Sequence, residues 1–204
     1  EVPPYGKVKG KTQRAYSMSS NPSDKNHLEF LVRLVPGGIV TTYVHEHLKE
    51  GEKLRVIGPF GEFMVRDTDA AMICVAGGSG MAPFKSIFQD RIERGILNDR
   101  QVWYFFGART KKDMFYLDWL YELDEKYDNF HFVAALSEPQ PEDDWQGPTG
   151  LITEVLDGYL KETIDPDVPK EGYLCGSPGM LDACIAVMQD NEMSEDKIYF
   201  DKFA

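Results

Sequence analysis

The sequence has few cysteines, a deficit of basic residues and no long apolar run. Its three cysteines lie far apart, without the close pairs of a zinc or iron–sulfur site, and this favours a reducing compartment. Lysine and arginine number 22 against 34 acidic residues, and a net charge of −12 argues against a nucleic-acid partner. No segment approaches the roughly 18 apolar residues of a membrane helix, and Glu1–Tyr5 has no secretory signal pattern. An ordinary globular composition is left, with 42% hydrophobic residues.

The apolar pattern changes once, near residue 66. Before that point, two short alternating segments at 28–34 and 53–57 predict strands, and one helix is expected at 42–49. Beyond it the chain alternates between buried strands and amphipathic helices. The predicted strands are residues 72–76, 102–106, 130–134, 172–175 and 197–200. Helices are predicted directly after Gly80, over residues 113–125 and over residues 178–189.

Strands that alternate with helices predict a parallel sheet covered on both faces. The fold class is therefore α/β with an all-β part. We expect two domains: residues 1–66 form the C-terminal portion of an antiparallel β-barrel, and residues 67–204 form an α/β domain. The acidic, proline-rich segment 138–148 is expected to be a surface loop.

The first chemical motif is Arg14-Ala15-Tyr16-Ser17. Arg14 supplies a fork for a diphosphate, Tyr16 a ring that can stack on a planar heterocycle, and Ser17 a short hydroxyl donor. Taken alone, the four residues also fit a surface strand with an exposed arginine and a core tyrosine.

A glycine turn leads into the expected helix of the first domain. Backbone N–H groups and hydroxyls at such a helix start can bind an anion. The residues concerned are Gly38, Val40, Thr41 and Thr42. The alternative is that Thr41 only caps the helix.

Two later strands each end in glycines and enter a helix. Glycines let the backbone approach a diphosphate, and two such loops at one edge of a parallel sheet form a ligand crevice. The first loop carries Gly77, Gly78, Gly80, Met81 and Pro83, and the second carries Cys175, Gly176 and Met180. The thiol of Cys175 can contact a reactive ring, or it can be a small buried apolar group.

In this order, the segments resemble the ferredoxin–NADP⁺ reductase family over essentially the whole chain. Within it, further segments look like the reductase subunits of Na⁺-translocating NADH:quinone oxidoreductases. They are residues 58–63, 107–109, 113–116, 135–143 and 201–203. The resemblance implies an FAD-binding barrel and an NAD(P)H-binding α/β domain. It also implies a membrane anchor and a [2Fe–2S] domain outside this sequence, on the cytoplasmic side of the inner membrane.

The resemblance assigns roles residue by residue. Arg14 would hold the FAD diphosphate, with Ala15 beside it, Tyr16 would pack on the ring, and Ser17 would lie near flavin N5. The helix-start residues named above would hold the same diphosphate. The NADH site would include the two glycine loops together with Gly107 and Arg109. Ser17 and Cys175 would be the catalytic residues, and Phe203 would shield the isoalloxazine ring.

Two departures from the family pattern lead to expectations. The family's barrel has more strands before Arg14 than this sequence supplies, and Glu1–Tyr5 looks like the tail of one of them. The start of the barrel is therefore expected to lie outside this sequence, which would leave FAD loosely held. The segment Pro36–Val40 is a variant of the family's glycine segment.

The implied reaction is hydride transfer from NADH to FAD, which requires the two rings to stack between the domains. Electrons would then pass singly to an iron–sulfur centre and onward to quinone, with other subunits of a membrane complex as partners. Arg109, Lys111 and Lys112 could receive the 2′-phosphate of NADPH, but the resemblance favours NADH. The alternatives are a soluble reductase that serves an oxygenase or a haem protein, and a non-catalytic nucleotide-binding module.

Overall fold

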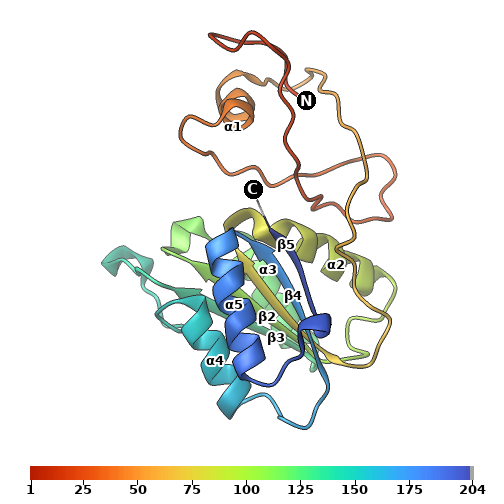
Figure 1. The fold of residues 1–204 in the computed structure, drawn as a ribbon, viewed down its shortest axis with the longest axis vertical. Coiled ribbons are helices and arrows are strands. Elements are labelled where there is room, and N and C mark those ends of the chain that lie inside the picture. Colours follow the sequence, from red (N-terminus) through yellow and green to blue (C-terminus); the bar gives the residue numbers. More distant parts are fainter. Residues whose placement is uncertain (203–204) are drawn as a thin grey trace.

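The structure, a computed structural model, describes residues 1–202. Its centre is a sheet of five strands, all parallel, in the order β3-β2-β1-β4-β5 (Figure 1). The strands are β1 (Ala71–Gly77), β2 (Val102–Ala108), β3 (Phe130–Leu136), β4 (Lys170–Gly176) and β5 (Ile198–Lys202). Among the described residues, no helix is long and apolar enough to cross a membrane.

Helices cover both faces of the sheet. On one face, α2 (Met81–Glu93) and α3 (Leu117–Lys126) enclose a core that contains Phe84, Tyr104 and Leu120. On the other, α4 (Ile152–Glu162) and α5 (Pro178–Asp190) enclose a core with Leu156 and Leu181. Because both faces are buried, β1 is a continuous apolar run instead of an alternating one. The predicted parallel sheet is confirmed.

The element boundaries differ from the prediction in two places. Helix α3 begins at Leu117, four positions later than expected, because residues 111–113 form a 3₁₀ turn that Asp113 closes. The Asp113 carboxylate accepts a hydrogen bond from the Thr110 hydroxyl at 2.8 Å. Helix α4 was not predicted, although Ile152, Val155, Leu156, Tyr159 and Leu160 carry the helical period.

The N-terminal segment, residues 1–66, contains little regular structure. The prediction of strands at 28–34 and 53–57 was wrong. An extended segment forms a strand only when a neighbouring segment pairs with it through a ladder of hydrogen bonds. In residues 1–66, which the structure describes in full, the β pairing consists of three isolated antiparallel bridges: Val2–Thr12, Tyr5–Val8 and Met18–Phe30. The expected helix lies earlier than predicted, as α1 (Ile39–Thr42) followed by a π-turn over Tyr43–His47.

A buried network holds the link between the two parts of the chain. Arg100 donates to the Glu171 carboxylate at 3.0 Å and to the carbonyls of Arg66 at 3.1 Å and Thr68 at 2.8 Å. Tyr173 donates its hydroxyl to the same Glu171 oxygen at 2.7 Å and accepts the Arg66 N–H at 3.0 Å. The backbone of the linking residues is thus fixed to buried side chains of the α/β part, although Arg66 and Thr68 are themselves exposed. A domain boundary at residue 66 stays a prediction.

Candidate functional site

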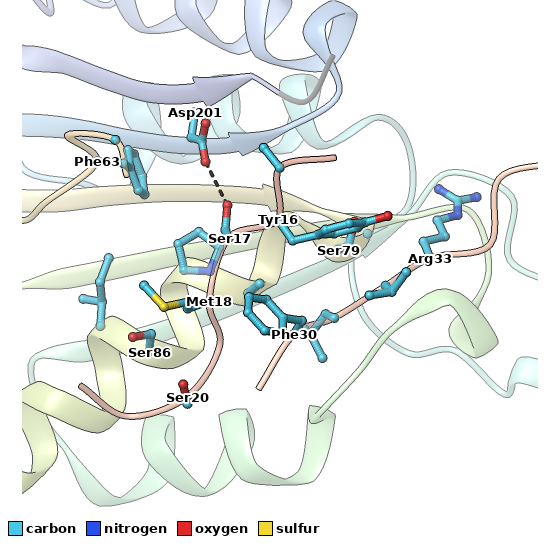
Figure 2. Close-up of a pocket in the computed structure, with 18 of the residues that line it drawn as sticks. Tyr16, Ser17, Met18, Ser20, Phe30, Arg33, Phe63, Ser79, Ser86 and Asp201 are labelled. Atoms are coloured by element: carbon cyan, nitrogen blue, oxygen red, sulfur yellow. Dashed lines mark hydrogen bonds between the residues drawn. The ribbon is translucent and has the colours of Figure 1, made fainter. Parts of the chain in front are cut away.

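A large cleft lies between the N-terminal segment and the carboxyl edge of the sheet (Figure 2). One wall carries Tyr16, Ser17 and Arg33, and the other carries the loops that follow the strands. In open α/β sheets this edge is where ligands bind. The predicted site residues that line the cleft are Arg14, Ala15, Tyr16, Ser17, Gly38, Val40, Thr41, Gly77, Gly78, Pro83, Gly107, Arg109 and Met180.

The two glycine loops lie at the same edge of the sheet, as predicted, and the strand order makes them neighbours there. Strands β1 and β4 are neighbours, and Ala76 pairs with Cys175 at the point where both strands end. A Cβ added to Gly80 would lie 2.1 Å from the Cys175 carbonyl oxygen, so the start of α2 touches the end of β4 directly. Gly80 itself and Met81 are buried, however, and face protein instead of the cleft.

Most of these glycines are explained by packing against protein. A Cβ on Gly77 would lie 2.6 Å from the Met180 sulfur, and one on Gly176 would lie 2.7 Å from the Met180 methyl group. Met180 therefore fills the slot between the two loops. Gly78, with a φ of +55°, differs from Gly77 and Gly176 because its nearest neighbour is the flexible end of a side chain, Arg33 Nη1, at 3.5 Å from an added Cβ. Gly78 is thus the loop glycine that is left for a ligand.

Arg33 is a cleft residue that the sequence analysis missed. It is exposed and lies across from the Gly78–Ser79 turn (Figure 2). Its charge contributes to lowering the pKa of Asp113, after the larger effects of the Thr110 hydroxyl and backbone. Its only signal in the sequence was a cation within the apolar segment 28–34, which we interpreted as part of a strand.

Ser17 is tied to the end of the sheet. Its hydroxyl donates to the Asp201 carboxylate at 2.8 Å, a contact between residues 184 positions apart (Figure 2). Asp201 lies on β5 and lines the cleft. It was not predicted as a site residue, although it opens the segment 201–203 on which part of the family resemblance rests. Tyr16, half-buried beside Ser17, has its pKa raised by burial.

Cys175 is fully buried and lies behind this pair. Burial, followed by the charge of Asp201, raises the pKa of its thiol far above the ordinary range, although the Ser17 hydroxyl opposes this effect. The side chain is therefore a neutral thiol that packs in the core next to Ser17. This placement combines the two interpretations of the sequence, a small buried side chain and a neighbour of the reactive region.

The glycine–helix segment has its hydroxyl engaged locally. Thr41 Oγ1 lies 3.3 Å from the carbonyl oxygens of Val35 and Gly38 and accepts the Val35 N–H at 3.2 Å. A Cβ on Gly38 would lie 2.6 Å from that hydroxyl, which accounts for the glycine. The hydroxyl thus closes the 35–41 turn and is not a helix N-cap, and Thr42 lies outside the cleft lining.

Two of the basic residues after β2, Arg109 and Lys111, are engaged within the chain. Arg109 donates from Nε and Nη2 to both oxygens of Glu138, at 3.1 and 2.6 Å. The Lys111 N–H donates to the Asp143 carboxylate at 3.3 Å, and its ammonium donates to the Asp143 backbone carbonyl, also at 3.3 Å. The fork of Arg109, which could have clamped a 2′-phosphate, is therefore occupied by a carboxylate of the same chain. Phe203, the predicted shield of the flavin, lies outside the described residues.

Comparison with known families agrees with this geometry. Residues 72–185 match the family described as the oxidoreductase NAD-binding domain, and residues 5–65 match the oxidoreductase FAD-binding domain. The chain belongs to the oxidoreductase NAD-binding domain family. It is an FAD- and NAD-binding oxidoreductase chain with the ferredoxin reductase-like fold, as predicted.

Two relatives of this family each share about two-fifths of the aligned residues with this chain. The F subunit of the Na(+)-translocating NADH-quinone reductase of Idiomarina loihiensis is 42% identical over 209 residues, which cover 97% of this chain and 50% of the relative. Its counterpart in Pseudoalteromonas atlantica is 39% identical over 207 residues, with the same coverage of 97% and 50%. The chain thus spans about half the length of these curated relatives.

Solved structures share the architecture. The ferredoxin reductase of carbazole 1,9a-dioxygenase has a TM-score of 0.76 and 30% identity, covering 97% of this chain and 57% of that one. A ferredoxin NADP+ reductase from Neisseria gonorrhoeae, solved with bound FAD and NADP, has a TM-score of 0.70 over 93% of this chain and 79% of that one. At 20% identity the second structure supports the fold alone.

Proposed function

We propose that the protein takes hydride from NADH onto FAD and passes electrons singly to an iron–sulfur centre and onward to quinone. The observation that carries this proposal is the Ser17–Asp201 contact, which joins the flavin motif to the edge where the nucleotide loops end. The whole protein would belong to a membrane complex, on the cytoplasmic side, through an anchor and a [2Fe–2S] domain outside this sequence. The names of the curated relatives support this assignment.

The cleft residues fit both groups. Gly78 has a left-handed backbone and no side chain, and the Arg33 guanidinium lies beside it, so this corner of the cleft offers donors for a diphosphate. Tyr16 and Ser17 offer a ring and a hydroxyl on the facing wall. We therefore expect Arg33, Gly78 and Ser79 to hold the nicotinamide nucleotide, and Arg14, Tyr16 and Ser17 to hold the flavin.

FAD, when bound, accepts a hydride from NADH and releases the electrons one at a time. The residues of the chain orient the partners and exclude water. Asp201 holds the Ser17 hydroxyl in one direction, and the buried, neutral Cys175 backs this pair without adding a charge. Met180 closes the slot between the two strand ends and keeps water out of it. No acid–base triad is needed for this chemistry.

A reduction experiment tests the proposal. Full-length protein purified with FAD should be yellow and should lose its flavin absorbance when NADH is added under anaerobic conditions. Asp201→Asn should slow this reduction by roughly 10–100-fold, the range expected for a misplaced reactant, with FAD content unchanged. Colourless protein after purification with FAD would favour the non-catalytic nucleotide-binding module.

The Arg109–Glu138 pair supports NADH over NADPH. A 2′-phosphate would meet the Glu138 carboxylate and would have to break a bidentate ion pair to reach Arg109. Glu138→Gln should therefore raise kcat/KM for NADPH by roughly tenfold and leave that for NADH nearly unchanged. Glu142→Gln, on the same exposed loop, is the matched control. A preference for NADPH in the wild-type protein would contradict this assignment.

A second candidate function is a soluble reductase that feeds an oxygenase or a haem protein. The names of two solved structures at 30% and 28% identity favour it, since they are the reductases of a dioxygenase and of a cytochrome P450. The reading frame upstream of Glu1 discriminates between the two. A cysteine cluster for [2Fe–2S] behind a hydrophobic helix would support the quinone reductase, and its absence would support the soluble reductase.

A further inference from the structure

One carboxylate oxygen joins three separate parts of the chain beside the cleft. Glu29 Oε1 accepts hydrogen bonds from Lys85 Nζ at 2.7 Å, from Ser19 Oγ at 2.9 Å and from the Tyr116 hydroxyl at 3.2 Å. Ser19 and Glu29 belong to the N-terminal segment, Lys85 to α2, and Tyr116 to the loop before α3. We call these four residues the Glu29 cluster.

Lys85 makes this contact obligatory. Its side chain is only 9% exposed, whereas that of Glu29 is 44% exposed. An ammonium buried without a partner is costly, so Lys85 needs the Glu29 carboxylate whenever the N-terminal segment is docked. The Lys85 ammonium also lies 5.0 Å from the centre of the Tyr116 ring, a cation–π distance. Such a pair fixes geometry more than it adds stability.

Tyr116 connects the cluster to the nucleotide side of the cleft. Its φ of 56° lies in the left-handed region, which a bulky residue adopts only where its surroundings hold it. The hydroxyl bond to Glu29 and the Lys85 charge supply that hold. Tyr116 ends the loop that starts at Arg109, so the Glu29 carboxylate holds the end of this loop that enters α3.

Glu29 is also connected to the flavin motif, Arg14–Ser17, through its neighbours in the sequence. Phe30, the next residue, forms an antiparallel bridge with Met18, and Met18 follows Ser17 directly. The Ser19 N–H also donates to the Glu29 carbonyl at 2.8 Å. A shift of Glu29 relative to α2 would therefore move Ser17 relative to the glycine loops.

We propose that Glu29 is a positioning residue for hydride transfer, which fixes the N-terminal segment against α2 and the Tyr116 loop so that the two cofactor sites face each other. This inference rests on the proposed function. Glu29 acts through Lys85 and Tyr116 and touches neither reacting group. Its loss should therefore affect the transfer step and leave the binding of each cofactor intact.

The test compares variants of the full-length protein, purified with FAD, by stopped-flow reduction with NADH. Glu29→Gln keeps the side-chain size but removes the charge, and should slow flavin reduction by roughly 10–100-fold. FAD content and the NADH dissociation constant should not change. Tyr116→Phe removes one hydroxyl and should give a smaller decrease, and the double variant should show less than the summed effect because the residues share one contact.

Glu93→Gln is the matched control. Glu93 also accepts bonds from the N-terminal segment, from Asn21 and Ser23, but it is exposed at the far end of α2. NADH should reduce the flavin of the Glu93→Gln variant at the wild-type rate. Flavin reduction at the wild-type rate in Glu29→Gln would overturn the inference, and so would a decrease explained by lost FAD. If Glu29→Gln fails to fold, Tyr116→Phe decides. Wild-type protein that NADH does not reduce would instead refute the proposed function.

Discussion

Gly80 is the position where a single methyl group should disturb both the fold and the cleft. Its φ of −60° suits any residue, so only the space around it limits substitution. An added Cβ would lie 2.1 Å from the Cys175 carbonyl oxygen and 2.6 Å from its carbonyl carbon, where ordinary contact begins at 3.4 Å. Both obstacles are backbone atoms, so the start of α2 and the end of β4 must move apart by about 1 Å. Overpacking a core forces backbone shifts of this kind.

We expect Gly80→Ala to lower the free energy of unfolding by about 1–3 kcal/mol, the usual cost of overpacking a core. Gly80 is the N-cap of α2, a position where alanine is less favourable than glycine, so helix propensity does not offset this loss. For a chain of this length a loss of about 1–3 kcal/mol corresponds to a fall in Tm of roughly 2–12 °C. Flavin reduction by NADH should slow as well, because the end of β4 carries Cys175 beside Ser17.

The matched control is Gly158→Ala, in the interior of α4. No atom lies within 4 Å of a Cβ added there, so the change should stabilise the protein by up to about 1 kcal/mol through helix propensity alone. Thermal unfolding of both variants, followed by circular dichroism, measures the difference. A Gly80→Ala protein as stable as Gly158→Ala would refute the argument that α2 and β4 are in backbone contact.

Three further predictions follow from the buried groups. Glu171→Gln should lower the free energy of unfolding by about 3–5 kcal/mol, measured with denaturant, because it leaves the Arg100 guanidinium buried without an anion. A loss below about 1 kcal/mol would show that water reaches the pair. Burial raises the pKa of the Cys184 thiol to about 12 from 9.0. The stability that this neutral thiol contributes is therefore complete below pH 9.0 and is lost as the pH rises toward 12. In a Cys184→Ala variant, the free energy of unfolding should fall less over this pH range. Cys175→Ala should slow flavin reduction by roughly 10–100-fold with FAD content unchanged, and reduction at the wild-type rate would leave Cys175 as a small buried side chain only.

The sequence by itself determined the parallel sheet and the place of the ligand edge. Apolar runs such as Met72–Ala76 are long enough for buried strands, and glycines mark where each strand enters a helix. Because the carboxyl ends of parallel strands meet at one edge, Gly77 and Cys175 could be expected side by side from the sequence alone. The helical period of α4 was also present and was overlooked.

Only the tertiary structure decided which residues work together. The Ser17–Asp201 contact and the Glu29 cluster join positions far apart in the sequence, and local periodicity carries no signal for such pairs. The roles of the glycines were hidden for the same reason, since Gly77 is required by Met180 and Gly80 by Cys175, whereas Gly78 and Gly176 are required by their own backbone conformations. Local residue patterns set the strands and turns, whereas the packing of distant segments set the cleft.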